Sequence, residues 1–558
     1  MADSNSGDTE AHRSSDPSGK RGGWITLPFM LVTLFGMSVT YFGWVMNLIV
    51  FLMEEFNIKS IAAVQISNIV NGLVNMLPVV AAIIADSYFG NIPVISASAF
   101  ISLTGISLLT LITSLDYLRP RPCETGSVLC QSPSTLHLGI LYAALALVIT
   151  GTAGTRFILA AAGANQYKKP KEQGTFFNWY FFAFYGGAIT GTTAIVYAQD
   201  NASWKLGFGL CVAANLISFI VFVSGKRLYN HDKPLGSPYT SLVRVLVAAT
   251  VKRKAVISSK DEDYHHRVLG NEAKTSAEMP SKSFRFLNRA ALKTEEYLNP
   301  SSDTIKNIWR LCSVKEVEDF KAVLRLVPLW TSVMFLSAPI AVQMSMTVLQ
   351  ALVMDRDLGP HFKVSAGSMQ VIPLISGCVF IMLNNWTTYP MYQKLIGKPL
   401  TPLQKVGIGH VLTILSMAIS AIVEAKRLKT VGNSHLMSVL WLVPALVING
   451  VGEAFHFPTN IAIFYGEFPE SLRNTATSLT SLVMGISYYL STALIDLIQR
   501  TTKWLPNDIN RGRVDNVYWV LVIIGVLNFA YFLTCSWFYK YRNLKNDDHE
   551  QDPKDVTT

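Results

Sequence analysis

Charged residues are scarce in this chain. Asp, Glu, Lys and Arg together make up only 15% of its 558 residues, while the mean hydropathy is +0.32. Its apolar runs are too long and too numerous for a soluble protein, because a helix needs about 20 apolar residues to cross a bilayer. The sequence therefore predicts an all-α polytopic membrane protein. Twelve candidate spans lie at about 25–53, 64–86, 92–113, 137–163, 176–198, 207–225, 322–352, 365–391, 402–424, 436–465, 474–498 and 517–539.

Signatures of catalysis are absent as well. The chain holds no P-loop, no HExxH, no GxSxG and no clustered Cys/His metal set. Neither an enzyme nor an ATP-driven pump is therefore expected, and no cofactor or metal is predicted. Gly151 and Gly154 fit no phosphate-binding loop, and their spacing indicates close helix packing instead. The net charge of +10 comes from loops that flank the membrane and indicates no nucleic-acid partner.

Acidic residues are rarest inside the apolar runs, so an intramembrane cation such as Arg156 has few possible counter-ions. No other charged residue lies between about 137 and 165. A guanidinium in a membrane costs roughly 2.5–3.5 kcal/mol on insertion scales, so such groups usually face a protein interior or a watery path. Among the long apolar stretches only Glu453 lies well away from both ends. A cation short of counter-ions suits an anion path. The alternative is a structural cation that pairs with Glu453 or reaches the membrane edge.

The polar N-terminal residues lack the layout of a cleavable signal peptide, so the first span is expected to remain in the mature protein. Twelve spans from a cytoplasmic start place both termini and the long central segment inside, which the Lys and Arg counts support only weakly. Cys123 and Cys130 then lie in an outer loop, where they could form a disulfide or remain free thiols. Asn201 begins a glycosylation sequon in another, very short outer loop.

Two groups of six spans flank the hydrophilic centre of the chain. We predict a cytoplasmic tail (1–23), an N-terminal half (24–225), a cytoplasmic linker (226–320), a C-terminal half (321–541) and a cytoplasmic tail (542–558). This layout resembles the major facilitator arrangement, in which two halves rock about a central site. The linker begins with an amphipathic helix at about 238–254, of a kind that often lies on a membrane surface. Residues 258–282 have the composition of a flexible segment, and a regulatory kinase is a candidate partner of this central loop.

Several motifs, in order along the chain, resemble those of one family. They include ADSYFGN at 85–91, GANQY at 163–167, FFNWYFFAFYGG at 176–187, WKLGFGL at 204–210, and the later FRFLNRAALKTEEY, VGEAFHFP and EFPESLRNTATSL. In combination they are similar to the plant branch of the nitrate/peptide (proton-coupled oligopeptide) transporter family, over nearly the whole chain. The resemblance implies a membrane carrier with the major facilitator fold.

The departures from the family pattern concern its acidic groups. Typical members carry Glu-x-x-Glu followed by Arg or Lys in the first span, where the carboxylates are associated with proton coupling. This chain has Leu34, Met37 and Ser38 in that stretch, so proton coupling through that motif is chemically unavailable. Aligned on the family, the acid expected in span ten is replaced by Ala462, whereas span four keeps a cation, Arg156 in place of lysine. An arginine presents forked donors that suit a small planar oxyanion.

The candidate substrate-binding residues all lie inside spans and are Arg156, Gln343, Tyr41 and His456. Asp86 belongs to a turn motif for which the resemblance implies a gating role, and Glu453 is a candidate for gating or coupling. Each has a structural alternative: Gln343 could bond one helix to another, whereas His456 and Tyr41 could be ordinary packing residues.

These features favour a plasma-membrane carrier of a small inorganic anion, nitrate or chloride, most like the nitrate-excretion branch of the family. A cell interior at about −100 mV favours exit of a monovalent anion by roughly 2.3 kcal/mol, so efflux is the expected direction. One alternative is proton-coupled transport of a larger organic anion, such as a glucosinolate or hormone conjugate. A membrane sensor or scaffold, which signals through the central loop, is an alternative of another class.

Overall fold

The described part of the chain is helical throughout its regular structure. The computed structural model describes residues 21–121, 132–156, 158–167, 169–231, 238–258, 260–266, 280–293, 309–360, 362–432, 436–468 and 473–539. Within these ranges twelve helices are long and apolar enough to cross a membrane. The all-α polytopic fold and the number of spans are therefore confirmed. Cys123 and Cys130 lie outside the described residues, so the disulfide stays a prediction.

The first six spans form one half of the molecule. Its elements are α1 (Leu27–Val45), α2 (Leu48–Glu54), α3 (Ser60–Ile84), η3 (Ala85–Phe89), α4 (Asn91–Ser114), α5 (Thr135–Arg156), α6 (Ile158–Ala164), α7 (Pro170–Thr190), η5 (Gly191–Ile195), α8 (Val196–Asn201) and α9 (Trp204–Ser224). The first predicted span is interrupted, because α1 gives way to α2 at Asn47. The fourth span runs over α5 and α6, Thr135–Ala164, with residue 157 outside the described residues.

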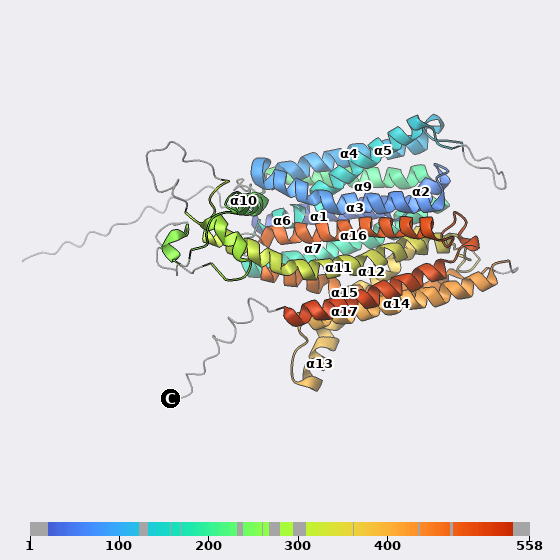
Figure 1. The fold of residues 1–558 in the computed structure, drawn as a ribbon. Coiled ribbons are helices and arrows are strands. Elements are labelled where there is room, and N and C mark those ends of the chain that lie inside the picture. Colours follow the sequence, from blue (N-terminus) through green and yellow to red (C-terminus); the bar gives the residue numbers. More distant parts are fainter. Residues whose placement is uncertain are drawn as a thin grey trace, which may run out of the picture.

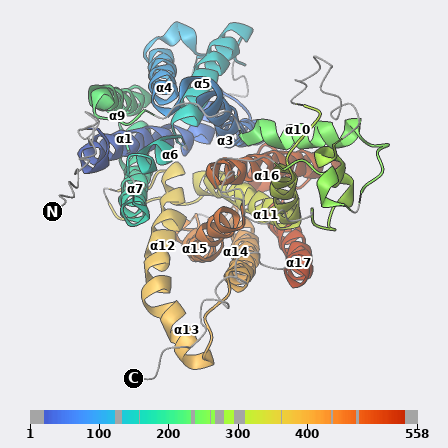
Figure 2. The same ribbon diagram turned by 90° about the vertical axis from the view of Figure 1, so that its left-hand side faces the viewer.

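The last six spans form the other half. They are α11 (Val314–Leu352), η10 (Gly367–Gln370), α12 (Val371–Leu383), η11 (Asn384–Thr388), α13 (Tyr389–Ile396), α14 (Pro402–Thr430), α15 (Val443–Glu467), α16 (Arg473–Thr501) and α17 (Val514–Phe538). The helix α11 begins with a capping box, in which Ser313 accepts from the amide of Glu316 and the Glu316 carboxylate accepts from the amide of Ser313. Viewed along the bundle, the two halves form two groups of helices (Figure 2).

Close helix contacts within the first half depend on glycine. A Cβ atom at Gly151 of α5 would lie 2.3 Å from the backbone nitrogen of Ser102 in α4, and one at Gly154 would lie 2.0 Å from Oγ of Ser98. No larger residue fits at either position without moving α4. The packing interpretation of these glycines is therefore confirmed.

The linker forms a small cluster at one end of the bundle, which we call the linker end (Figure 1). The predicted amphipathic helix is present as α10 (Pro238–Val251), beside the 3-10 helix η8 (Arg285–Ala291). Its buried face, with Val245 and Ala248, packs against Leu287 of η8 and Val317 of α11. The helix α11 thus extends beyond the expected start of the second half and serves as the platform for the linker.

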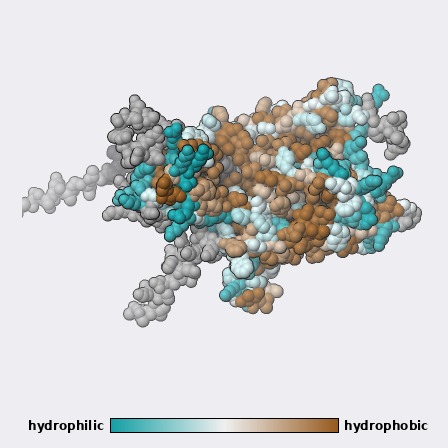
Figure 3. Space-filling view, viewed as in Figure 1, coloured by the Kyte–Doolittle hydropathy of each residue, from teal (hydrophilic) through white to brown (hydrophobic). Residues whose placement is uncertain are grey.

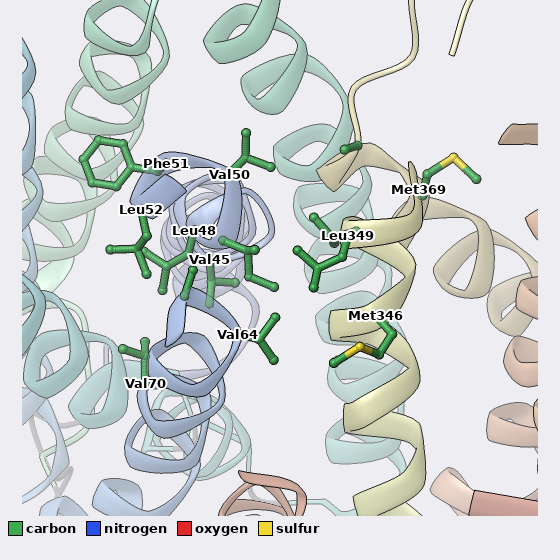
Figure 4. Close-up of a cluster of buried hydrophobic side chains, with 14 of the residues drawn as sticks. Val45, Leu48, Val50, Phe51, Leu52, Val64, Val70, Met346, Leu349 and Met369 are labelled. Atoms are coloured by element: carbon green, nitrogen blue, oxygen red, sulfur yellow. The ribbon is translucent and has the colours of Figure 1, made fainter. Parts of the chain in front are cut away.

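At the opposite end, which we call the loop end, the two halves share one core. Val45, Leu48 and Phe51 from α1 and α2 belong to the same buried cluster as Met346 and Leu349 from α11. Figure 4 shows these side chains facing one another across the two halves. The surface seen in Figure 3 is mainly hydrophobic along the middle of the bundle and more hydrophilic at both ends, as a membrane-spanning body requires.

Candidate functional site

Arg156 lies within the fourth span, Thr135–Ala164, among aromatic rings. Its guanidinium carbon lies 5.0 Å from the ring centroid of Tyr41 and 5.3 Å from that of Phe184. The Tyr41 hydroxyl also interacts with the Arg156 side chain, and the Tyr180 hydroxyl donates a 3.0 Å hydrogen bond to the Arg156 carbonyl oxygen. The aromatic faces stabilise the guanidinium by cation–π attraction. The structure thus holds a positive charge in the interior of the first half.

A cavity adjoins Arg156 inside the first half. It is walled by α1, α4, α5, α6, α7 and α9, and Tyr41 also lines it. Leu34, Met37 and Ser38, the three residues that replace the family's acidic stretch, are part of the same wall. The cavity is therefore bordered both by Arg156 and by the residues that stand in place of the family's acidic motif. The complete wall consists of Leu34, Met37, Ser38, Thr40, Tyr41, Ser102, Thr152, Thr155, Arg156, Leu159, Phe184 and Asn215.

Glu453 faces the same central region from the second half. Tyr185 of α7 and Tyr488 of α16 each lie within electrostatic range of both Arg156 and Glu453. Nδ2 of Asn449 donates a 3.1 Å hydrogen bond to Oε1 of Glu453, one turn away on α15. The Glu453 carboxylate and the Arg156 guanidinium therefore both interact electrostatically with the hydroxyls of Tyr185 and Tyr488, one tyrosine in each half.

Ala462 and Glu453 lie on the same helix, α15, nine residues apart. Ala462 is exposed, whereas Glu453 lies within electrostatic range of Tyr185 and Tyr488, as Arg156 does. Residues nine positions apart on an α-helix point in opposite directions. The loss of a family acid at Ala462 stays a prediction.

Two of the predicted substrate-binding residues lie away from Arg156. Nε2 of Gln343 donates 2.8 Å hydrogen bonds to the hydroxyls of Ser416 and Ser420, which ties α11 to α14. His456 is 2% exposed and packs against the backbone of α14 at Gly409. Neither is among the residues that line the cavity beside Arg156. The two hydrogen bonds of Gln343 favour its structural alternative, and a substrate role for His456 stays a prediction.

Asp86 lies in η3, the π-helical end of α3. This element is followed directly by α4 through Gly90, whose φ of +77° favours glycine. Asp86 is not among the residues that line the cavity. A gating role for Asp86 stays a prediction.

The loop end carries a seal between the halves that the sequence did not reveal. Nδ2 of Asn47, at the α1–α2 junction, donates a 2.8 Å hydrogen bond to Oδ1 of Asp200, and Arg356 from the second half lies 4.0 Å from Oδ2 of the same carboxylate. A Cβ atom at Gly367 would lie 2.7 Å from Oδ1 of Asn47 and 2.8 Å from the carbonyl oxygen of Met46. Only a glycine allows this approach of η10 to the first half.

Further contacts across the halves reinforce this seal. The rings of Tyr197 and Phe362 stack with centroids 5.6 Å apart, and the Ser368 hydroxyl donates a 2.8 Å hydrogen bond to the carbonyl oxygen of Thr192. Deeper in the bundle, Ser345 donates to Oδ1 of Asn68 at 3.0 Å. The structure is thus closed between the halves at its loop end.

Two six-helix halves that close against each other at one end, one of them with a cation in its interior, define a secondary transporter of the major facilitator type. Comparisons with known proteins identify the family. The family model described as the POT family matches residues 93–511. The chain is 88% identical to Protein NRT1/PTR FAMILY 2.4 of Arabidopsis thaliana over 557 residues and 82% identical to Protein NRT1/PTR FAMILY 2.5 of the same plant over 560 residues, with 100% of each chain covered in both cases.

The fold agrees with solved structures of the same family. The POT family transporter PepTSo superposes with a TM-score of 0.69 at 16% identity, over 95% of this chain and 99% of that chain. The protein belongs to the POT family of membrane transporters, as the motifs indicated. It is a multi-pass membrane transporter and not an enzyme.

Several residues of the site were missed from the sequence. Tyr488 lies in an ordinary apolar stretch of α16, and Thr152 and Ser102 are small polar residues that helices often use for packing. No local pattern distinguishes such residues, because their role depends on which face of each helix the tertiary packing turns inward.

Proposed function

We propose that this protein carries a small inorganic anion, nitrate or chloride, out of plant cells across the plasma membrane. Flux follows the electrochemical gradient, and access alternates between the two ends of the bundle as the halves rock about the site. Both termini and the linker face the cytoplasm in this proposal, so the sealed loop end faces the outside.

The observation that carries the proposal is the position of Arg156. A permanently charged guanidinium lies beside a cavity whose described wall contains no Asp or Glu. Its charge favours an anion electrostatically, and its forked N–H groups match a planar oxyanion. The stretch of α1 in the wall offers no titratable carboxylate, which supports transport without proton coupling through that helix.

Glu453 supports a second candidate function, the proton-coupled transport of a larger organic anion. It is a carboxylate in the interior, and it acts on the same tyrosines as Arg156. A carboxylate in such a place can take up and release a proton as its surroundings change during transport. Coupling would then use α15 in place of α1.

The decisive experiment measures anion flux from proteoliposomes with voltage and pH gradients set independently. For the purified full-length protein we expect nitrate or chloride efflux under an inside-negative potential, with no pH gradient. Arg156→Ala should abolish this flux. Arg500→Ala, which removes an arginine exposed near the loop end and paired with Asp496, should leave it unchanged.

The same assay separates the two candidates. Glu453→Gln should retain voltage-driven flux if transport is uncoupled from protons. A flux of a bulky organic anion that requires an imposed pH gradient, and that Glu453→Gln eliminates, would establish the second candidate. Unchanged nitrate and chloride flux in Arg156→Ala would reject the role of Arg156.

A further inference from the structure

We propose that the cavity behind Arg156 is a selective subsite for a small inorganic anion, in which Ser38, Thr152 and Ser102 donate hydrogen bonds to the ion. The subsite lies inside the first half, between α1, α4 and α5, and not between the two halves. The inference rests on the proposed function and names the residues that would decide which anions are carried.

The hydroxyl groups of the wall differ in what they already bond. Thr40 donates to the carbonyl oxygen of Gly36 at 3.0 Å, and Thr155 donates to that of Thr152 at 3.0 Å. In contrast, the hydroxyls of Ser38 and Thr152 have no hydrogen-bond partner among the residues that the structure describes, although their side chains are only 5% and 8% exposed. Two donors therefore border the cavity with their hydrogens available.

Ser102 adds a third donor. Its oxygen accepts a 2.9 Å hydrogen bond from Nδ2 of Asn215, which leaves the hydroxyl hydrogen directed elsewhere. Asn215 is 1% exposed, and its Oδ1 is a buried acceptor without a partner in the described part of the chain. It can accept from a water molecule that enters with the ion, since buried polar groups are normally satisfied by protein or by water.

The electrostatics of the wall select an anion. Arg156 is the cation among the twelve wall residues, and no carboxylate stands among them. A desolvated ion is stabilised when fixed donors replace its hydration shell, and hydrogen bonds to a charged group are stronger than those between neutral groups. Leu34, Met37 and Phe184 supply the apolar remainder, which disfavours strongly hydrated ions. Nitrate and chloride fit this combination of one charge, three hydroxyl donors and an apolar surround.

The depth of the subsite is limited by the close approach of α4 and α5. Gly151 brings α5 against the backbone of α4 at Ser102, and Gly154 brings it against the side chain of Ser98. There is thus no room for the wall to move outward around a large organic molecule. A bulky anion would contact Arg156 from the central region but could not reach the hydroxyls.

The test compares variants that differ by one donor. Thr152→Val removes the hydroxyl and keeps the shape, Thr152→Ser keeps the hydroxyl and removes the methyl group, and Ser38→Ala removes the donor on α1. Thr113→Val is the matched control, because Thr113 is a buried threonine of α4 outside the cavity, bonded to the carbonyl of Thr110. Voltage-driven nitrate flux from proteoliposomes gives KM and the maximal rate. In parallel, the thermal unfolding midpoint of each purified full-length variant is measured against nitrate concentration.

We expect Thr152→Val and Ser38→Ala each to raise the KM for nitrate by about tenfold, as loss of one hydrogen bond to a charged group implies, with a smaller change in maximal rate. The nitrate concentration that gives half of the maximal stabilisation should rise in parallel. Thr152→Ser and Thr113→Val should resemble the unmodified protein.

The outcomes separate this inference from the proposed function. Equal KM and equal stabilisation in all variants, with normal flux, would overturn the subsite and leave anion transport standing. Absence of nitrate and chloride flux in the unmodified protein, together with nitrate stabilisation that Thr152→Val weakens, would reject the transport proposal and retain the subsite. Absence of both flux and stabilisation would reject both.

Discussion

Replacing Gly367 should shift the balance between the two access states. Its Cβ position lies 2.7 Å from Oδ1 of Asn47 and 2.8 Å from the carbonyl oxygen of Met46. Both atoms belong to the first half, whereas Gly367 belongs to the second. Gly367→Val would therefore force the halves apart at the loop end only. The contact between Gly367 and Asn47 exists only while the loop end is closed, as it is in the state open at the linker end. In the state open at the loop end the two halves separate there, so the contact is absent and the valine side chain has room.

The size of the shift follows from the contacts that are lost. Overpacking of this kind costs about 1–3 kcal/mol. Displacing Asn47 would also weaken its bond to Asp200, a charge-assisted contact whose contribution is about 1.5–3 kcal/mol. The two costs together are about 2.5–6 kcal/mol. Because 1.4 kcal/mol is tenfold in an equilibrium constant, the variant should favour the loop-end-open state by about sixtyfold or more.

Pulsed electron resonance between two spin labels measures this directly. Labels at Lys205, at the start of α9, and at Lys429, near the end of α14, would lie on exposed positions of opposite halves at the loop end. In a background without native cysteines, Gly367→Val should populate longer distances between the labels. Gly209→Ala is the control, because its Cβ meets nothing within 4 Å. An unchanged distance distribution in a folded, monodisperse Gly367→Val protein would refute the seal.

Two further predictions concern buried charges. Arg427→Met should lower the free energy of unfolding by about 3–5 kcal/mol, because it leaves the fully buried Glu424 without its bidentate partner; the double variant with Glu424→Gln should recover much of the loss, as thermal unfolding in detergent would show. In the linker, burial lowers the pKa of Lys252 from 10.5 to about 8, so the unfolded linker binds more protons between those pH values and linker stability should rise with pH there. Lys252→Met should remove this rise. The measurement is amide hydrogen exchange in η8, because the carbonyl oxygen of Ala290 in η8 accepts a hydrogen bond from Lys252. If linker stability rises equally with pH in the variant, another group is responsible.

The class of this protein can be predicted from local features of its sequence. Spans are recognisable because a bilayer requires about 20 consecutive apolar residues, and this requirement is local to each segment. The amphipathic helix of the linker was predictable for the same reason, since its apolar spacing is visible within a single stretch. The small-residue spacing of Gly151 and Gly154 also indicated close packing before any partner helix was known. Family motifs then narrowed the class to one transporter family.

Which polar residues lie close together depends on how the helices pack, and this cannot be predicted from local sequence patterns. Arg156 was identified by its cost in a membrane, but its surroundings come from α1, α7 and the second half, which no local pattern specifies. The packing of α15 brings Glu453 within electrostatic range of Tyr185, which Arg156 also reaches. Likewise, Gln343 bonds to Ser416 and Ser420 of α14, and Ser38 and Thr152 border the cavity. The direction in which a helical side chain points depends on the rotation of the whole helix against its neighbours. That rotation is set by contacts between segments far apart in the chain.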